Sequence, residues 1–447
     1  MPELSTLATA LVLGSVTCFF FCFYVYRKLS GVVIKKDSKH SEPLAFSISS
    51  VYEFASDVSK LALMMLLVYL CENFPPHPHS QKVHDMDMFW VMTAVLFLWS
   101  FTDVRKSKTT DILNREQTEE WKGWMQFMFL LYHYFSAHEV YNSIRVMITC
   151  YVWMTGFGNF SFFYIKRDFG ALRFLQMLWR LNFLVFFLCM TLGNNYILYY
   201  ICPLHTFYFF LVFATMGIWQ GLNHTKWGIR IKLFVVALVI YTVWDLNSGI
   251  FKGFFGLFLS QDPVVGATSG TLYEWYFRTS LDHWSTYLGM IFALNFPMAT
   301  AWLKVTEAMP AKTQLLVKGL PALVAIATVV WWSAAVLPLP KLDYNAGNAY
   351  FAWVPMVCYV FLRNLHPALR QWYLHPLHNI GKITLETYLC QHHLWLTSNA
   401  KTLLNILPAY PKVNLVAAGA LYVGCSQELH RLTMSLRGAL LPDRVPA

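Results

Sequence analysis

The sequence predicts an all-α polytopic membrane protein, a bundle of about 11–13 transmembrane helices with no large soluble domain. Apolar residues make up 57% of the 447 residues and charged residues only 13%, whereas soluble domains carry about 25% charged residues. Long apolar runs recur along the whole chain, which is typical of helices that cross a bilayer repeatedly. Nearly the entire length is needed to build such spans.

The apolar runs define thirteen candidate spans, with boundaries good to a few residues. They lie at about 6–26, 57–72, 87–103, 122–139, 143–162, 172–192, 196–218, 230–247, 282–303, 316–338, 348–363, 380–398 and 411–428. Several are marginal against the roughly 20 apolar residues that a span requires. The segments 196–218 and 380–398 could be re-entrant or broken.

Basic clusters follow every second span, and this alternation predicts the orientation. "RKLSGVVIKKDSK" follows the first span and "RKSK" the third. Because cytosolic loops are enriched in Lys and Arg, we expect a lumenal or external N-terminus and a cytosolic C-terminus. The clusters form no continuous patch, so the net charge of +10 does not indicate nucleic-acid binding.

The same pattern divides the chain into three parts. Residues 1–44 are expected to form a first span and a basic cytosolic loop, residues 45–430 a multi-span domain, and residues 431–447 a basic cytosolic tail. The N-terminal apolar run shows no convincing small-residue cleavage site. We therefore interpret it as a retained span rather than a signal peptide.

Cysteines and loop histidines give little indication of a metal site. Nine cysteines lie mostly inside apolar runs without a C-x-x-C pair, so we interpret them as small buried hydrophobic residues. His77, His79 and His84 share a Pro-rich loop that could bind a metal, but a solvated loop is the better interpretation. We predict no metal cofactor.

The sequon at Asn223 falls in a predicted cytosolic loop, so we expect no glycan there.

One apolar run carries an ionisable histidine deep inside it. In "EEWKGWMQFMFLLYHYF", Lys122 would open the span at the cytosolic surface, and His133 follows eleven residues later on nearly the same helix face. That separation is about 16 Å at 1.5 Å per residue, close to the bilayer centre. Ionisable groups in spans are costly and usually face a cavity, so we predict a functional pair. The structural alternative is a snorkelling lysine and a histidine bonded within the bundle.

Further polar residues lie in or near apolar runs, at Arg180, His205, Asp245, Glu386, Gln391, His392 and His393. Glu386 and His393 are seven residues apart and would share a helix face. This density of polar groups exceeds what helix association requires. At the predicted lumenal entrance to the ninth span, Glu274, Arg278 and Asp282 are spaced by four. They would line one face of a helix, either at an acceptor site or only as an ion-pair ladder.

Four motifs in order resemble the multi-span sialate and capsule-polysaccharide O-acetyltransferase family, and the plant reduced wall acetylation proteins most of all. They are "EEWKGWMQFMFLLYHYF", "LGNNYILYYICPLHTFYF", "YEWYFRTSLDHW" and "KITLETYLCQHHLWL", and the resemblance runs from about residue 45 to near the C-terminus. Lys122 and His133 are also similar to the R-x10-H pair of bacterial membrane acyltransferases. There the arginine is linked to the acyl-CoA side and the histidine is essential. Lysine keeps the charge but loses bidentate geometry.

The resemblance implies that residues 45–430 are an acyltransferase domain, that the protein resides in the Golgi membrane, and that it serves O-acetylation of cell-wall polysaccharides. Animal and fungal members carry a lumenal serine-hydrolase-like domain with a Gly-Asp-Ser motif. No Gly-Asp-Ser occurs in this sequence, and in this it resembles the plant proteins. A separate lumenal acetyltransferase is therefore an expected partner, besides membrane lipid, the polysaccharide and a second copy of the chain.

The leading hypothesis is an acyltransferase that uses acetyl-CoA as co-substrate. Its phosphates would lie near Lys122 and Glu120 at the cytosolic mouth, and its thioester near His133. His133 would be a general base or a transient acyl carrier, with Glu386 and His393 as its catalytic partners. One rival is a transporter that moves acetyl-CoA or another acetyl donor without chemistry. Another is a scaffold for lumenal acetyltransferases. The acceptor polysaccharide stays open.

Overall fold

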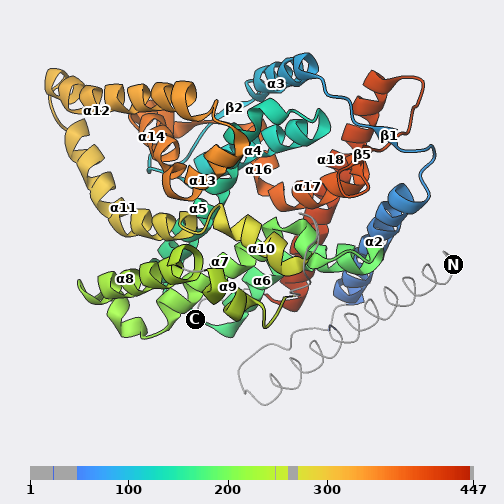
Figure 1. The fold of residues 1–447 in the computed structure, drawn as a ribbon, viewed down its shortest axis with the longest axis horizontal. Coiled ribbons are helices and arrows are strands. Elements are labelled where there is room, and N and C mark those ends of the chain that lie inside the picture. Colours follow the sequence, from blue (N-terminus) through green and yellow to red (C-terminus); the bar gives the residue numbers. More distant parts are fainter. Residues whose placement is uncertain (1–23, 25–47, 247, 260–269, 443–447) are drawn as a thin grey trace. The chain divides into compact units, whose positions relative to one another are not determined.

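The computed structural model describes Tyr24 and residues 48–246, 248–259 and 270–442, and Figure 1 shows its elements. Apart from Tyr24, the first predicted span and residues 1–44 lie outside this part of the chain. The chain divides into two compact units. The first comprises the described parts of Met1–Lys82, Gly170–Tyr199 and Leu385–Ala447, and the second comprises those of Val83–Phe169 and Tyr200–Thr384.

The first unit is built on three long helices that pack on one another, α2, α6 and α18. Its elements are α2 (Ile48–Asn73), β1 (Ser80–Gln81), α6 (Ala171–Leu192), the 3-10 turn η2 (Tyr196–Tyr199), α17 (Thr384–Cys390) from Leu385 on, the π-helical turn η6 (Gln391–Trp395), β4 (Leu396–Thr397), β5 (Thr402–Leu403) and α18 (Pro411–Leu440). The three strands form a small antiparallel sheet in the order β1-β5-β4, in which Ser80 and Leu396 both pair with Leu403.

The second unit contains the remaining helices and a two-stranded ribbon. In chain order its elements are α3 (Met86–Ser100), β2 (Val104–Lys106), α4 (Arg115–Tyr134), η1 (His138–Val140), α5 (Tyr141–Lys166), α7 (Ile201–Gly217), η3 (Gln220–His224), α8 (Gly228–Ile240), η4 (Tyr241–Leu246), α9 (Ser248–Phe255), α10 (Thr271–Ser280), α11 (Ser285–Glu307), α12 (Ala311–Trp331), η5 (Trp332–Val336), α13 (Lys341–Phe351), α14 (Trp353–Arg363), α15 (Pro367–Gln371), β3 (Trp372–Leu374) and α16 (His375–Lys382). Strands β2 and β3 pair antiparallel, with Lys106 opposite Trp372.

Two helix pairs in this unit cross with almost no space between their backbones. A Cβ on Gly123 of α4 would lie 1.9 Å from the Leu377 carbonyl oxygen, and one on Gly381 of α16 would lie 1.8 Å from that of Glu119. Gly156 of α5 and Gly289 of α11 form a second crossing of the same kind. Small residues allow this close approach of helices in membrane proteins. The crossings hold α4 against α16 and α5 against α11 (Figure 1).

The protein is a multi-pass helical membrane protein, as the composition predicts. Within the described residues, five helical stretches are long and apolar enough to span a bilayer, namely Val51–Asn73, His138–Lys166, Ala171–Leu192, Thr271–Glu307 and Ala311–Val336. The last is also the least buried, with Leu315, Leu316 and Leu320 all about 70% exposed or more. Such exposure suits lipid as the surrounding solvent, because lipid tails are as apolar as leucine.

The helix that carries the run 122–139, α4, ends before the predicted bound, at Tyr134, and begins ahead of the apolar run, at Arg115. Its N-terminus is capped by Asn114, whose side chain accepts a hydrogen bond from the Gln117 N–H at 2.8 Å. The helix ends at Tyr134, and Ser136 takes a left-handed φ of 48°. The polar first turns are helical but carry no apolar run, which is why the sequence pattern did not include them.

Two other predicted spans are interrupted. The run 348–363 divides between α13 and α14, which meet at Ala352. The run 380–398, expected to be re-entrant or broken, consists of the end of α16, α17 and the π-helical turn η6. In contrast, α18 continues through Leu440 and takes in the first ten residues of the predicted tail. Leu432, Leu436 and Leu440 are buried there at helical spacing.

Candidate functional site

Both residues predicted to bind the cofactor already contact protein groups on α4 and its neighbours. The Lys122 ammonium lies 2.6 Å from the Glu119 carboxylate, one helical turn earlier, and its side chain is 26% exposed. The Glu120 carboxylate accepts a hydrogen bond from the Leu374 N–H at 2.7 Å and lies 3.3 Å from the Arg363 guanidinium. Glu120 therefore joins α4 to β3 and α14, while Lys122 keeps a partly exposed cation at the helix surface.

His133 is the penultimate residue of α4. The helix is continuous from Lys122, so the separation of almost three turns holds. The imidazole is half-buried, and its ring meets that of Tyr132 edge-on at 5.0 Å. His133 thus lies in the last turn of α4, one residue before the helix ends at Tyr134.

A second histidine of this unit is tied to the turn that carries Lys122. The Nδ1 atom of His205 on α7 lies 2.6 Å from the Thr155 hydroxyl on α5. One turn earlier on α5, the Tyr151 hydroxyl donates to the Lys122 carbonyl oxygen at 2.6 Å. These two hydrogen bonds join α7 to α5 and α5 to α4. His205, predicted only as an intramembrane polar residue, is therefore linked through α5 to the turn that carries Lys122.

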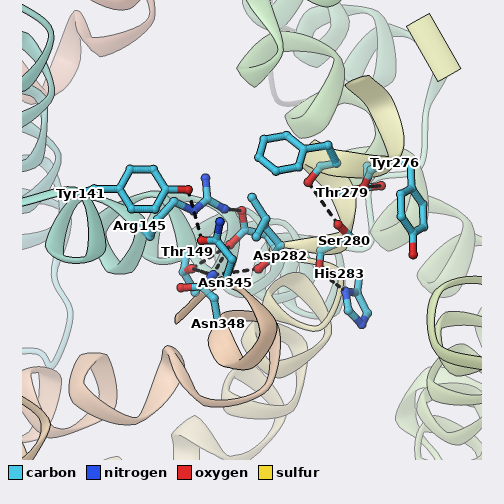
Figure 2. Close-up of polar contacts among 12 residues, drawn as sticks. Tyr141, Arg145, Thr149, Tyr276, Thr279, Ser280, Asp282, His283, Asn345 and Asn348 are labelled. Atoms are coloured by element: carbon cyan, nitrogen blue, oxygen red, sulfur yellow. Dashed lines mark hydrogen bonds and ion pairs between the residues drawn. The ribbon is translucent and has the colours of Figure 1, made fainter. Parts of the chain in front are cut away.

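Figure 2 shows the buried ion pair at the predicted lumenal entrance. The Asp282 carboxylate lies 2.7 Å from the Arg145 guanidinium and also accepts a hydrogen bond from the Thr149 hydroxyl at 2.7 Å. Asn348 donates to Thr149 at 3.2 Å and to the Leu281 carbonyl oxygen at 2.8 Å. Asp282 and Arg145 are almost completely buried. The network therefore joins α5, α13 and the turn before α11.

The expected ladder from Glu274 through Arg278 to Asp282 is wrong at its last step. Glu274 and Arg278 do form an i,i+4 pair at 3.7 Å, and Arg278 also lies over the Tyr200 ring at 4.1 Å. However, α10 ends at Ser280, so Asp282 leaves that helix face and meets Arg145 instead. Two separate ion pairs take the place of one ladder.

Asp245, noted in the sequence, meets His283 in the same unit. One Asp245 oxygen lies 3.0 Å from His283 Nε2 and accepts a hydrogen bond from the Tyr350 hydroxyl at 2.5 Å. The other accepts from the Trp284 indole N–H at 3.1 Å. The carboxylate thus holds the π-helical turn η4 against α13 and the start of α11.

In the first unit, His393 is completely buried between a carboxylate and a phenol. Its Nδ1 atom is hydrogen-bonded to the Glu72 carboxylate at the end of α2. Its Nε2 atom lies 2.6 Å from the Tyr199 hydroxyl, in the last residue of η2. Three segments far apart in the sequence therefore meet at one imidazole. This arrangement contains a base, a group that orients it and a hydroxyl.

Glu386 has different partners from His393. Its carboxylate, fully buried, takes a bidentate pair from the Arg180 guanidinium on α6, with one contact at 3.0 Å, and lies 3.4 Å from His430 Nδ1 on α18. The polar residues Arg180 and Glu386, predicted separately, are thus one ion pair. It fastens α6 and α18 to α17.

Gln391 and His392 complete the polar segment. His392 Nδ1 contacts the Tyr388 carbonyl oxygen one turn earlier at 2.9 Å. Gln391 is 1% exposed, and no hydrogen-bond partner for its Oε1 or Nε2 is found among the described residues. A buried amide without partners is unusual, because the lost hydration costs free energy.

Metal ligation has no candidate in the described part of the chain, where no group of three or more His, Cys, Asp or Glu side chains is placed to hold an ion. The seven described cysteines are all free thiols, and five are buried.

Sequence reasoning missed three residues that complete these clusters. Glu72 and Tyr199 bind His393, and Arg145 binds Asp282. Glu72 closes an apolar run, where a carboxylate is ordinary, and Tyr199 is one of several tyrosines in "NNYILYY". Arg145 lies near the start of the apolar run 143–162. None of the three carries a local signal of its partner.

The fold and these clusters define a multi-pass helical membrane protein with buried acid–base groups. Comparison with known families makes the class more specific. Residues 3–446 match the family described as the "10 TM Acyl Transferase domain found in Cas1p", and the chain belongs to this family of membrane acyltransferases. The description specifies ten spans, and the interruptions of the runs 348–363 and 380–398 fit a count below thirteen.

A curated relative from Danio rerio, named N-acetylneuraminate (7)9-O-acetyltransferase, is 31% identical over 470 aligned residues. The alignment covers 99% of this chain and 58% of the relative, so this chain spans somewhat over half of the relative's length. No solved structure matches the chain.

Proposed function

We propose that this protein is an O-acetyltransferase that passes an acetyl group from acetyl-CoA to a sugar hydroxyl. The observation that carries the proposal is the acyltransferase family match, which extends over almost the entire chain. The relative from Danio rerio is named for acetylation of hydroxyls on a sugar acid. Buried histidines beside hydroxyl and carboxylate groups supply the acid–base chemistry that such a transfer requires.

In this proposal the reaction starts at the Lys122 end of α4. Acetyl-CoA binds there by its phosphates, with Lys122 as the partly exposed cation and Glu120 paired with Arg363. His133 acts as base or acyl carrier toward the far end of the same helix. Glu386 and His393 are the further catalytic candidates. Glu274, Arg278 and Asp282 shape the acceptor entrance, Asp282 through its pair with Arg145.

We further propose the Golgi membrane as the location and a cell-wall polysaccharide as the final acceptor. The N-terminus would be lumenal and the C-terminus cytosolic, so that acetyl-CoA enters from the cytosol and the acetyl group leaves into the lumen. A separate lumenal acetyltransferase would complete the transfer. The alternation of basic loops supports the orientation, and the resemblance to plant wall-acetylation proteins supports the acceptor.

The test uses purified protein in liposomes, supplied with acetyl-labelled acetyl-CoA from the Lys122 side. We expect free CoA outside and acetyl label inside. His133→Ala should abolish both, and Lys122→Ala should raise the KM for acetyl-CoA. The exposed His138 and Lys166, as His138→Ala and Lys166→Ala, are the matched controls and should leave both signals unchanged.

Other outcomes would contradict the proposal. Intact acetyl-CoA accumulating inside, with little effect of His133→Ala, would identify a transporter. Full dependence on an added lumenal acetyltransferase, with the His133→Ala variant as active as the wild type, would identify a scaffold.

A further inference from the structure

The hydrogen bonds around His393 fix the position of its protons. A carboxylate can only accept, so the Nδ1 atom of His393 must donate to Glu72. In the neutral ring Nε2 is then an acceptor, and the Tyr199 hydroxyl must donate to it across 2.6 Å. Asn194 donates to the same phenol oxygen at 3.1 Å. The result is one chain from carboxylate through imidazole to phenol.

A strained stretch of backbone holds the carboxylate end of this chain. Both Glu72 oxygens accept from the Ser398 N–H, at 2.8 and 3.2 Å. Ser398, Asn399 and Ala400 have φ values of 54°, 58° and 64°, three successive left-handed residues without a glycine. Side chains at Cβ disfavour this conformation, and it persists only where the surroundings enforce it, often at functional sites. The position of the Glu72 carboxylate is therefore fixed by the Ser398 backbone as well as by the packing of α2.

The chemistry of the chain is that of a hydroxyl-activating triad. In acyl-transfer enzymes a hydroxyl donates to an imidazole whose other nitrogen donates to a carboxylate. Here the phenol of Tyr199 occupies the hydroxyl position. His393 and Tyr199 are both buried, and the Nε2 atom of His393 has Tyr199 as its partner. Proton exchange at Nε2 therefore passes through the Tyr199 oxygen.

The geometry points to Tyr199 as a catalytic acid–base residue of the acetyl transfer, with Glu72 and His393 as its positioning residues. This inference rests on the proposed function. It adds Tyr199 and Glu72 to the candidate catalytic residues of the first unit, and it gives His393 a role through the phenol rather than against the substrate itself.

The proton transfers balance in such a step. The acceptor hydroxyl gives its proton to the Tyr199 oxygen while the Tyr199 proton moves to His393 Nε2, and Glu72 stabilises the resulting imidazolium. The acceptor oxygen bonds to the acetyl carbon and the carbon–sulfur bond breaks. The proton then returns from Nε2 through Tyr199 to the leaving thiolate. The products are the acetyl ester and free CoA, and the protein is unchanged.

The test compares Tyr199→Phe with Tyr422→Phe in the liposome assay. Tyr422 is a second buried tyrosine of the same unit, whose hydroxyl donates to the Thr387 carbonyl oxygen at 2.6 Å. Loss of general acid–base catalysis lowers rates by about 10²–10⁴-fold. We therefore expect kcat to fall by about that factor in Tyr199→Phe with the KM for acetyl-CoA unchanged, while Tyr422→Phe keeps its kcat.

Glu72 provides the second arm. Glu72→Gln should lower kcat, and Glu72→Asp should restore part of it because the carboxylate is retained. Asp57→Asn, which removes a carboxylate that pairs with Arg431 in the same unit, is the matched control and should keep its kcat. Thermal unfolding of each variant reports whether it is folded.

The outcomes separate this inference from the proposed function. A Tyr199→Phe variant that releases CoA as fast as Tyr422→Phe, beside an active wild type, would overturn the role of Tyr199 alone. A wild type that releases no CoA at all would overturn the proposed function, and this role with it.

Discussion

The side chain of Gln391 is buried but differs from its neighbours in its hydrogen bonding. Its neighbours His392 and His393 are both hydrogen-bonded, whereas the Gln391 amide has no partner among the described residues. Leaving a buried polar group unsatisfied costs about 1–3 kcal/mol. An unsatisfied amide at Gln391 is therefore expected to lower the stability of the fold.

We predict that Gln391→Met raises the temperature of thermal unfolding in detergent, because methionine has a similar volume and no polar group to desolvate. The control is Asn414→Leu in the same unit. Asn414 donates to the Leu404 carbonyl oxygen at 2.9 Å and accepts from the Ile406 and Leu407 N–H groups. Losing these bonds should lower the unfolding temperature. A Gln391→Met variant that melts as early as Asn414→Leu would show that the amide has a stabilising partner.

At the residue scale, sequence reasoning identified polar residues but not their partners. His393, Glu386 and Arg180 stood out because ionisable groups are rare in apolar runs. That Arg180 binds Glu386, and that Glu72 rather than Glu386 binds His393, could not be predicted. The Glu72 and His393 residues are 321 positions apart, and helix periodicity relates only residues a few turns apart.

The packing of α5 against α11 depends on which of its two neighbouring glycines lies at the helix crossing. Gly156 and Gly158 are two residues apart on this helix, so they point in different directions. A Cβ on Gly156 would lie 2.1 Å from the Thr286 carbonyl oxygen of α11, whereas nothing lies within 4 Å of one on Gly158. The sequence motif "GFGNF" does not distinguish the two positions.

We predict opposite effects of the same substitution at these two glycines. Gly158→Ala should stabilise the protein by about 0.5–1 kcal/mol, because alanine is the better helix former. Gly156→Ala should destabilise it by about 1–3 kcal/mol, since α5 and α11 must move apart. Thermal unfolding in detergent measures both. Equal melting temperatures for the two variants would mean that the crossing at Gly156 is not as close as the structure has it.

At the level of the whole molecule, both the predicted topology and the folded structure indicate that the sequon at Asn223 is not glycosylated. The pattern places Asn223 in a cytosolic loop. Independently, the Asn223 side chain is 2% exposed, donates to the Met216 carbonyl oxygen at 2.7 Å and accepts from the Lys232 ammonium. An amide held in this way is inaccessible to a glycosylating enzyme in the folded protein.

We therefore predict no glycan on Asn223 when the protein is made in a glycosylating eukaryotic cell, measured as the absence of an endoglycosidase-sensitive gel shift. The control is Gly266→Asn, which completes a sequon with Ala267 and Thr268 in the loop predicted to be lumenal, and this variant should shift. A wild-type shift that Thr225→Ala removes would contradict the predicted orientation.

Local patterns in the sequence are enough to predict the class of the molecule, its apolar segments and the segment that carries Lys122 and His133. These properties are local, because hydrophobic burial in lipid and the helical repeat act within one segment. The ends of α4 and α18, the breaks in the apolar runs and the partners of the buried charges become visible only in the folded protein. Those outcomes depend on capping, on backbone contact at Gly123 and Gly156, and on hydrogen bonds between segments hundreds of residues apart. A sequence pattern does not encode such contacts, because any of several helices could supply them.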